Sequence, residues 1–313
     1  MARVFVVGSS LPNGGTYMAH TIGEILERRF GYALVAVDAG IAAPTDVFSY
    51  RIVPPSIPLE ALFTEPKADD IIVINPSFSS LGVGLRSPAR TICYVQGFNT
   101  YPLLDLFLGD YVSVGPFVAG HLKAHYGLET PIIPAFINDP ADPLPPWDER
   151  PVHTVLVSAK ATTDLNRAIV DRVMQRLETE CPDLTFERLG AGHVPQAAIF
   201  ERLAQYRYFL TMSITEGFGL LPLEAMAHGL YVFGFDGFGG RTYMNPGVDC
   251  MTVAYPDLDG IIAAARLIRD DPGRVATIAT AAQRTGRSFD RATFEARWTA
   301  HLAGLLGRTP LGA

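Results

Sequence analysis

Short apolar runs alternate with longer amphipathic stretches along most of the chain. Runs of about 4–8 residues rich in Val, Ile, Leu and Phe are typical of strands that a parallel sheet buries on both faces. In the first half of the chain we expect such strands at residues 3–8, 33–38, 71–75, 91–97, 111–115 and 131–136. Helical spacing predicts helices at residues 17–30 and 116–126. Strands that alternate with helices in this way indicate a Rossmann-like α/β domain.

A run of prolines separates this domain from a second one. Seven of the 24 prolines lie between residues 131 and 151, where fixed φ angles and missing amide donors favour a stiff linker over a sheet. After it we expect strands at residues 152–159, 184–189, 208–213, 230–236 and 250–255. The predicted domains are residues 1–138 and 152–290, with a linker at 139–151 and a terminal helix at 291–313.

Two predicted helices of the second half have clear apolar faces. One follows the strand at 152–159, has Thr163 or Asp164 as its N-cap, and carries apolar residues at four-residue spacing: Leu165, Ile169, Val173 and Leu177. The last fifty residues have a helical pattern throughout, and the terminal helix has its own stripe: Phe294, Trp298, Leu302 and Leu305. Such a stripe must be buried, and packing on the first domain is the arrangement that we expect.

Composition excludes several classes of protein. The 313 residues carry 25 basic and 32 acidic groups, a formal net charge of −7, which argues against nucleic acid as a partner and against a polybasic membrane anchor. Cys93, Cys181 and Cys250 form no metal-binding or disulfide pattern, so reduced thiols are expected. No signal peptide and no apolar stretch near the ~20 residues of a membrane span is present. We expect a cytoplasmic protein without a transmembrane segment; a peripheral position at the inner membrane stays open.

The most specific stretch runs from Ser213 to Gly229, with the sequence SITEGFGLLPLEAMAHG. A strand ends at Ser213, Glu216 opens a loop, and a helix is expected to begin near Leu220. Glycines at 217 and 219 allow a ligand to approach the backbone, and unpaired amides at a helix N-terminus suit phosphate or sugar oxygens. Glu224 lies on the same helix. Two carboxylates near this loop predict a site for a polyhydroxyl ligand.

Glu216 and Glu224, with seven residues between them in this glycine-rich context, resemble the signature of retaining GT-B glycosyltransferases of the family 4 type. The resemblance extends to Asn13-Gly14-Gly15, Leu189-Gly-Ala-Gly192 and Phe238-Gly-Gly240. It implies two Rossmann-like domains with parallel sheets facing a central cleft and a C-terminal helix that crosses back. It also implies metal-independent transfer of a sugar, without a cofactor, from a nucleoside-diphosphate-sugar donor. The acceptor would be a carbohydrate, a small molecule or a lipid-linked sugar, as in polysaccharide biosynthesis. A non-catalytic nucleotide-sugar-binding protein and a sugar-nucleotide epimerase are the alternatives.

By the same resemblance, Glu216 and Lys160 are the catalytic residues, with Lys160 neutralising the departing diphosphate. The residues implied in donor binding are Ser213, Gly217, Phe218, Gly219, Leu220, Glu224, Gly190, Gly14 and Gly15. Further candidates are Arg241, Arg167, His193 and Gln96, and Gly14, Gly15 and Gln96 are also candidates for the acceptor side.

Four positions depart from the family pattern. Lys160 stands where an arginine is usual, and Leu165 stands where a second lysine is usual, so one positive charge is missing. Gln96 replaces a histidine of the first domain, and Tyr243 replaces an acidic residue. Arg167 and Arg241 are the candidates to supply the missing charge.

Two other groupings imitate metal sites. Asp257-Leu-Asp259 imitates an Asp-x-Asp metal motif, but it precedes a helix, and an N-cap is the better interpretation. His121 and His125 lie one helical turn apart, as in a two-histidine metal face, but no third ligand accompanies them. No metal is expected.

Overall fold

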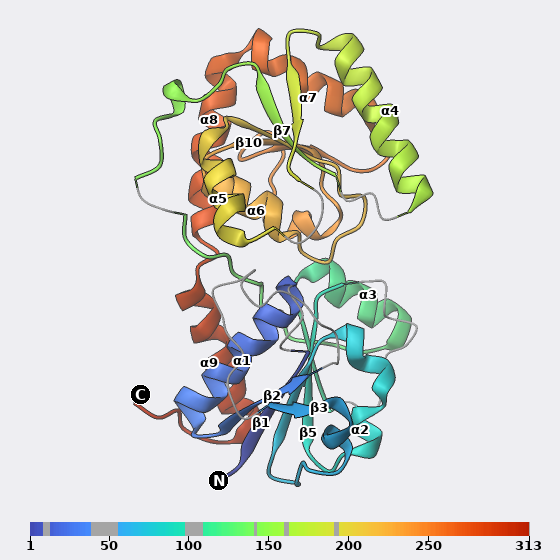
Figure 1. The fold of residues 1–313 in the computed structure, drawn as a ribbon, viewed down its shortest axis with the longest axis vertical. Coiled ribbons are helices and arrows are strands. Elements are labelled where there is room, and N and C mark those ends of the chain that lie inside the picture. Colours follow the sequence, from blue (N-terminus) through green and yellow to red (C-terminus); the bar gives the residue numbers. More distant parts are fainter. Residues whose placement is uncertain are drawn as a thin grey trace. The chain divides into compact units, whose positions relative to one another are not determined.

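A computed structural model describes residues 1–8, 13–38, 56–97, 109–140, 143–159, 163–190 and 194–312 (Figure 1). The chain splits into two compact units. Unit 1 consists of Met1–Ala135 and Arg291–Ala313, and unit 2 of Phe136–Asp290. Each unit contains one parallel sheet with helices packed against it. The predicted pair of parallel-sheet α/β domains is confirmed.

The sheet of unit 1 has the strand order β3-β2-β1-β4-β5-β6. The strands are β1 (Arg3–Val7), β2 (Ala33–Asp38), β3 (Ser56–Pro58), β4 (Ile71–Ile74), β5 (Arg90–Val95) and β6 (Asp110–Ser113). The central strands are apolar and fully buried, as strands covered on both faces must be. The order of the strands reverses between β1 and β4, which is the switch point of this sheet.

The helices of unit 1 are α1 (Gly14–Phe30), α2 (Val83–Arg86), α3 (Pro116–Tyr126) and α9 (Arg291–Leu306), with 3-10 turns at Leu59–Phe63 and Pro76–Leu81. The N-cap of α1 is Asn13, whose side chain accepts a hydrogen bond from the amide of Thr16 at 2.9 Å. Its C-cap is Gly31, in the left-handed conformation that glycine adopts without cost.

Helix α9, at the far end of the chain, packs on α1 (Figure 1). Arg291 bonds to Glu24 at 2.5 Å, and Arg28 bonds to Glu295 at 2.9 Å. The stripe predicted for this helix is buried at Phe294, Trp298 and Leu302. The ring of Trp298 meets the ring of Tyr94 edge-on, with centroids 5.4 Å apart. Aromatic packing and ion pairs together hold the end of the chain on unit 1.

The sheet of unit 2 has the order β11-β10-β9-β7-β8. Its strands are β7 (Thr154–Ser158), β8 (Thr185–Arg188), β9 (Tyr208–Thr211), β10 (Tyr231–Phe235) and β11 (Met251–Val253). Its helices are α4 (Asp164–Glu180), α5 (Gln196–Gln205), α6 (Leu220–Ala227), α7 (Leu258–Asp270) and α8 (Pro272–Arg287). Apolar side chains of α4, α7 and α8 pack on the strands to form the core of this unit.

Two details differ from the predictions. Residues 131–136 form no strand: Ile132 makes one isolated bridge to Ser113, because Pro131 and Pro134 remove two of the donors that a ladder needs. In α4 the predicted N-cap is confirmed at Thr163, but the buried face of the helix differs from the predicted apolar face. Leu165 is 67% exposed, and the buried residues are Val170, Val173, Met174 and Leu177.

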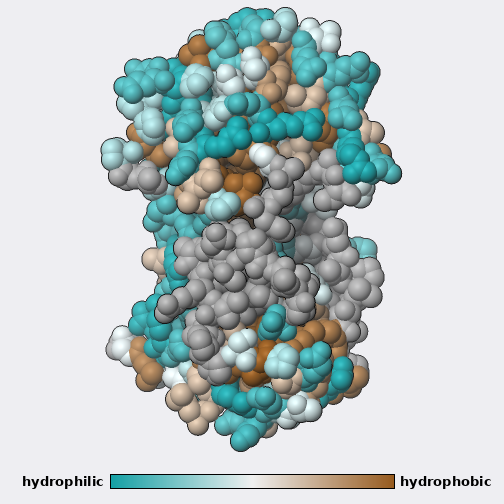
Figure 2. Space-filling view, in the orientation of Figure 1, coloured by the Kyte–Doolittle hydropathy of each residue, from teal (hydrophilic) through white to brown (hydrophobic). Residues whose placement is uncertain are grey.

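The exposed apolar side chains of the described surface lie on separate elements rather than on one helix. The large ones include Leu85 on α2, Phe117 on α3 and Val248 in the loop before β11. On the face of the molecule that Figure 2 shows, hydrophilic and apolar residues are intermixed wherever the surface is coloured by hydropathy. No helix among the described ranges combines the length and apolarity that a membrane span requires.

Candidate functional site

The carboxyl ends of β7 and β9 lie side by side in the sheet of unit 2. Ser158 pairs with Thr211, the last residue of β9, and the amide of Met212 donates to the Ser158 carbonyl at 3.0 Å. In the order β8-β7-β9-β10-β11 the direction of winding changes between these two strands. Ligands of open α/β sheets bind outside the carboxyl ends of the strands at such a point. Lys160 follows β7 by two residues and lies outside the described residues.

Two backbone hydrogen bonds tie the loop after β9 to the loop after β10. The Glu216 amide donates to the Gly237 carbonyl at 2.7 Å, and the Gly239 amide donates to the Glu216 carbonyl at 3.0 Å. The Ser213 hydroxyl donates to Oε1 of the Glu216 carboxylate at 3.1 Å. Both the backbone and the carboxylate of Glu216 are therefore held by neighbouring residues.

The loop after β10 approaches the Glu216 loop closely. A Cβ on Gly239 would lie 2.4 Å from the Gly217 carbonyl carbon, so this position requires glycine. Phe238 has a φ of 62°, and no other non-glycine residue that the structure describes has a positive φ. Such a conformation costs about 1–3 kcal/mol and is most common at functional sites. The strain coincides with the contact to Glu216.

The start of α6 is fixed by a tyrosine. Gly219 is the N-cap, with a φ of 87°, and its carbonyl accepts a hydrogen bond from the Tyr243 hydroxyl at 2.5 Å. The rings of Phe218, Tyr243 and Phe289 pack together, with centroids 5.2 to 5.9 Å apart. Burial raises the pKa of Tyr243 well above its ordinary value, and the negative charge of Glu216 raises it further. Tyr243 is therefore a neutral hydrogen-bond donor.

Glu224 lies in the second turn of α6 and is 6% exposed. Its Oε1 accepts a hydrogen bond from Nε2 of Gln196 at 2.8 Å, and Oε1 of Gln196 accepts one from Nδ2 of Asn138 at 2.6 Å. The charge of Glu224 also contributes to the raised pKa of Tyr243. The two carboxylates predicted from the motif thus act on the same tyrosine.

At the end of α6, His228 is buried, and its Nδ1 lies 2.7 Å from the Glu224 carbonyl oxygen. Burial lowers the pKa of His228 to about 4, so the imidazole is neutral at pH 7 and Nδ1 donates this bond. The Arg150 guanidinium donates to the His228 carbonyl at 3.0 Å. Positive charge at a helix C-terminus is favourable, so both ends of α6 are held in place.

The other predicted residues of unit 2 differ in their placement. Nε of Arg241, three residues after the strained Phe238, bonds to Oδ2 of Asp236 at 2.7 Å. Arg167 lies in the first turn of α4, pairs with Asp164 and is more than half exposed. Gly190 follows β8 and is exposed, whereas His193 lies outside the described residues. Of the three that the structure describes, only Arg241 lies at the two loops that hold Glu216.

In unit 1, Gly14 and Gly15 form the first turn of α1. Nε2 of Gln96, just after β5, donates to the Gly15 carbonyl at 3.2 Å. A Cβ on Gly15 would lie 3.4 Å from Oε1 of Gln96 and 3.5 Å from Nδ2 of Asn75. Gly15, Gln96 and Asn75 thus lie together at the carboxyl edge of the sheet of unit 1, and Gly14 precedes Gly15 in the chain.

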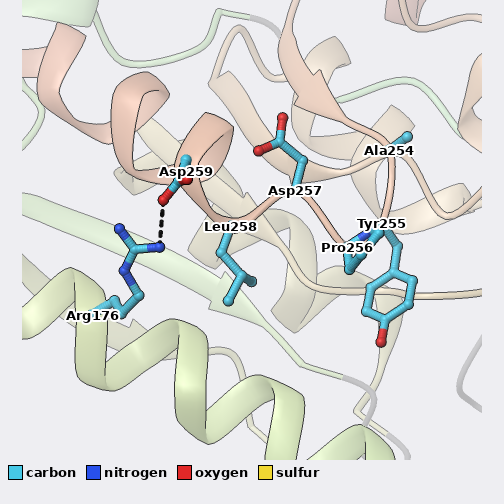
Figure 3. A pocket seen from close by; sticks show the side chains of 7 residues that line it. All are labelled: Arg176, Ala254, Tyr255, Pro256, Asp257, Leu258 and Asp259. Atoms are coloured by element: carbon cyan, nitrogen blue, oxygen red, sulfur yellow. Dashed lines mark hydrogen bonds and ion pairs between the residues drawn. The ribbon is translucent and has the colours of Figure 1, made fainter.

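A hollow of about 620 Å³ lies elsewhere in unit 2 (Figure 3). It is lined by residues 254–259, between β11 and α7, and by Arg176, which forms an ion pair with Asp259 at 2.7 Å. Asp257 is the N-cap of α7, as predicted, and accepts from the Gly260 amide at 2.9 Å. None of the predicted site residues that the structure describes lines this hollow.

The histidines of α3 form no larger cluster. The rings of His121 and His125 lie 4.2 Å apart, and among the described residues no group of three His, Cys, Asp or Glu side chains is arranged to hold a metal ion. These two residues thus belong to the surface of α3.

Comparison with known proteins extends these observations. Residues 156–271 match the family model described as "Glycosyl transferases group 1". Sucrose-phosphate synthase from Thermosynechococcus elongatus superposes with a TM-score of 0.70 at 14% identity, covering 98% of this chain and 100% of that chain. Anabaena HepE in complex with UDP superposes with a TM-score of 0.71 at 13% identity, covering 97% and 100%. The fold is GT-B. The lipopolysaccharide outer core galactosyltransferase WaaB shares it at 12% identity, with a TM-score of 0.70 and coverage of 97% and 100%.

No curated protein sequence matches the chain. The predicted resemblance to GT-B glycosyltransferases is confirmed at the level of the fold. Assignment to family 4 and retention of configuration stay predictions. The segment that matches the family model runs from β7 into α7, so it contains Glu216, Glu224 and Tyr243.

The GT-B structure adds two residues that sequence reasoning did not identify, Gln196 and Asn138. Gln196 bonds to Glu224 across a separation of 28 residues, and Asn138 bonds to Gln196 across 58 residues. Asn138 was assigned to the end of the first domain, next to the proline-rich linker. The only feature of the sequence that could have indicated a role for Asn138 is its position, as a polar residue directly before that linker.

Proposed function

We propose that this protein is a retaining glycosyltransferase that transfers a sugar from a nucleoside-diphosphate-sugar donor. The observation that carries the proposal is the position of the Glu216–Glu224 motif at the switch point of the unit 2 sheet, inside the segment that matches the family model. The Anabaena structure with UDP has the same fold, which supports a nucleoside diphosphate as the ligand.

The donor is bound by unit 2. Amides of Gly217, Phe218 and Gly219 and the start of α6 face the sugar and its phosphates, where the positive end of the helix dipole favours an anion. Glu216, held by Ser213, accepts hydrogen bonds from hydroxyls of the donor sugar. Glu224 accepts hydrogen bonds from the ribose hydroxyls.

The chemical step breaks the bond between the anomeric carbon and the diphosphate oxygen. The acceptor oxygen forms the new bond to the anomeric carbon, and its proton passes to the departing diphosphate. Negative charge grows on the diphosphate as it leaves. Lys160 and the α6 amides stabilise this charge, which is commonly the largest single contribution to catalysis. No metal ion or cofactor takes part. The acceptor, a carbohydrate or lipid-linked sugar, is bound by residues of unit 1 that include Gly14, Gly15 and Gln96.

The proposal is tested by thermal shift with UDP, GDP, ADP and their sugar conjugates, followed by an assay of donor hydrolysis and transfer in the presence of EDTA. Glu216→Ala and Lys160→Ala should retain folding and lose turnover at least 100-fold. Glu201→Ala, an exposed glutamate of α5, and Lys123→Ala, an exposed lysine of α3, are the matched controls. NMR of the product should show the anomeric configuration of the donor.

Three results would contradict the proposal in different ways. Stabilisation without turnover for any acceptor indicates the non-catalytic binding protein. Interconversion of the donor sugar without transfer indicates an epimerase. If no nucleotide stabilises the protein, the assignment of the site itself is wrong.

A further inference from the structure

The carboxylate of Glu224 is the end of a directional chain of side-chain amides. Asn138 donates through Nδ2 to Oε1 of Gln196 at 2.6 Å, and Gln196 donates through Nε2 to Oε1 of Glu224 at 2.8 Å. All three side chains are shielded from solvent in part or almost completely. The sequence motif that identifies Glu224 contains neither amide.

The hydrogen bonds of this chain can run from donor to acceptor in only one direction. An ionised carboxylate accepts hydrogen bonds and donates none, so Gln196 must present its NH₂ group to Glu224. The carbonyl of the Gln196 amide then faces away and needs a donor, which Asn138 supplies. A flipped Gln196 amide would place oxygen against the Glu224 carboxylate and nitrogen against the Asn138 NH₂. Asn138 thus stabilises the orientation in which the NH₂ group of Gln196 faces Glu224.

Both amides are anchored by backbone that is itself fixed. Gln196 is the first residue of α5, directly after Pro195, whose ring restricts the entry to the helix. The residue before Asn138, Ile137, donates its amide to the Phe289 carbonyl at 3.0 Å. Phe289 packs against Phe218 in the glycine loop. The amides therefore connect Glu224 to α5 and to the segment that carries Asn138, both in unit 2.

We propose that Gln196, oriented by Asn138, is the positioning residue that holds the Glu224 carboxylate in its ribose-binding orientation. This inference rests on the proposed function. A glutamate has three rotatable bonds, and a bidentate contact with two vicinal hydroxyls requires one orientation of its carboxylate. The carboxylate has about four acceptor positions. One hydrogen bond from Gln196 therefore orients it without exhausting its capacity to accept from a ribose.

The test compares ribose recognition in variants of the full-length protein. Dissociation constants for UDP and for 2′-deoxy-UDP are measured by calorimetry for the wild type, Gln196→Ala, Gln196→Glu and Asn138→Ala. Gln205→Ala is the matched control, because Gln205 is the exposed last residue of the same helix. Circular dichroism and thermal melts establish that each variant is folded.

The wild type should prefer UDP over 2′-deoxy-UDP by about tenfold, as expected for a hydrogen bond to a charged group. In Gln196→Ala this preference should fall to about twofold, through weaker binding of UDP, and Asn138→Ala should show a smaller loss in the same direction. Gln196→Glu should have the largest effect, because a second carboxylate would face Glu224. Gln205→Ala should match the wild type.

The ratio of the two constants separates positioning from a general effect on folding. If Gln196→Ala weakens UDP and 2′-deoxy-UDP equally, or weakens neither, the positioning role is wrong although the proposed function stands. The wild type is also titrated with GDP, with ADP and with their 2′-deoxy analogues. If it binds none of these nucleotides and does not bind UDP, both the proposed function and the role of Gln196 are wrong.

Discussion

Gly239 lies where the loop after β10 crosses the backbone of the Glu216 loop, and its replacement by alanine tests how the site is built. A Cβ at this position would lie 2.4 Å from the Gly217 carbonyl carbon and 2.5 Å from both the Glu216 oxygen and the Phe218 nitrogen. Ordinary contact between such atoms begins at about 3.5 Å. All three are backbone atoms and cannot rotate aside, so Gly239→Ala must move one loop by about 1 Å.

The cost follows from what this movement breaks. Forcing an extra carbon into a packed site costs roughly 1–3 kcal/mol. The Glu216–Gly237 and Gly239–Glu216 backbone bonds, at 2.7 and 3.0 Å, join the two loops, and the loss of one costs about 1 kcal/mol more. We therefore expect a loss of about 3 kcal/mol in the free energy of unfolding. For a unit of the size of unit 2, Phe136–Asp290, that lowers the Tm by about 6–12 °C.

The assay is a thermal melt with and without UDP, followed by calorimetric titration. Gly239→Ala should bind UDP at least tenfold more weakly than the wild type, because the Glu216 loop is displaced. Gly273→Ala is the control: it lies on α8, and the nearest atom to its Cβ, Oδ1 of Asp271, is 3.8 Å away. A Gly239→Ala protein with wild-type Tm and wild-type affinity would refute the reasoning, since the loops would then tolerate a side chain at their crossing.

Two further predictions concern the ends of α6. Tyr243→Phe removes a buried hydroxyl that donates to Gly219 at 2.5 Å, and Tyr231→Phe, the control, removes one that donates to Ala264 at 2.9 Å. Both variants should lose about 1 kcal/mol in the free energy of unfolding, but only Tyr243→Phe should weaken UDP binding in calorimetry. Equal weakening of UDP binding in the two variants would contradict a specific role of Tyr243. Burial lowers the pKa of His228 to about 4 from 6.5, so the unfolded chain binds this proton first as the pH falls. The free energy of unfolding, measured in urea, should therefore fall by about 3 kcal/mol between pH 6.5 and pH 4. His228→Gln should show a smaller fall. If His228→Gln has the same pH profile as the wild type, groups other than His228 cause the fall.

The apolar pattern was sufficient to predict the two sheets, because strands covered on both faces are almost entirely apolar. It failed where that condition is absent. Strand β3, Ser56–Pro58, lies beside β2 at the edge of the described sheet, and two of its three residues are exposed. It has one apolar residue between serine and proline, so the apolar pattern does not predict it. Residues 131–136 were predicted as a strand because they are apolar, although their prolines cannot donate to a ladder. A hydropathy pattern contains no information on which residues lack the backbone hydrogen-bond donor that a strand needs.

The candidate site was predictable to the extent that its residues are close in the sequence. Glu216, Gly219 and Glu224 occur within one motif, and the structure places them on one loop and the helix that follows it. Contacts such as Gln196 to Glu224 connect different elements, and side-chain amides carry no periodic signal. Their role depends on a tertiary arrangement that a single sequence does not encode locally.

Tyr243 shows how two departures from the family pattern are related. The resemblance implies an acidic residue at this position and a second lysine at the position of Leu165, which is exposed in the first turn of α4. The loss of one negative and one positive group leaves the summed charge of these two positions unchanged. The raised pKa of Tyr243 keeps its hydroxyl neutral beside Glu216, so the tyrosine supplies a hydrogen bond to Gly219 without adding charge. Tyr243→Phe therefore changes the hydrogen bond alone, and any loss of nucleotide affinity measures how far the geometry of Gly219 contributes to binding of the phosphates.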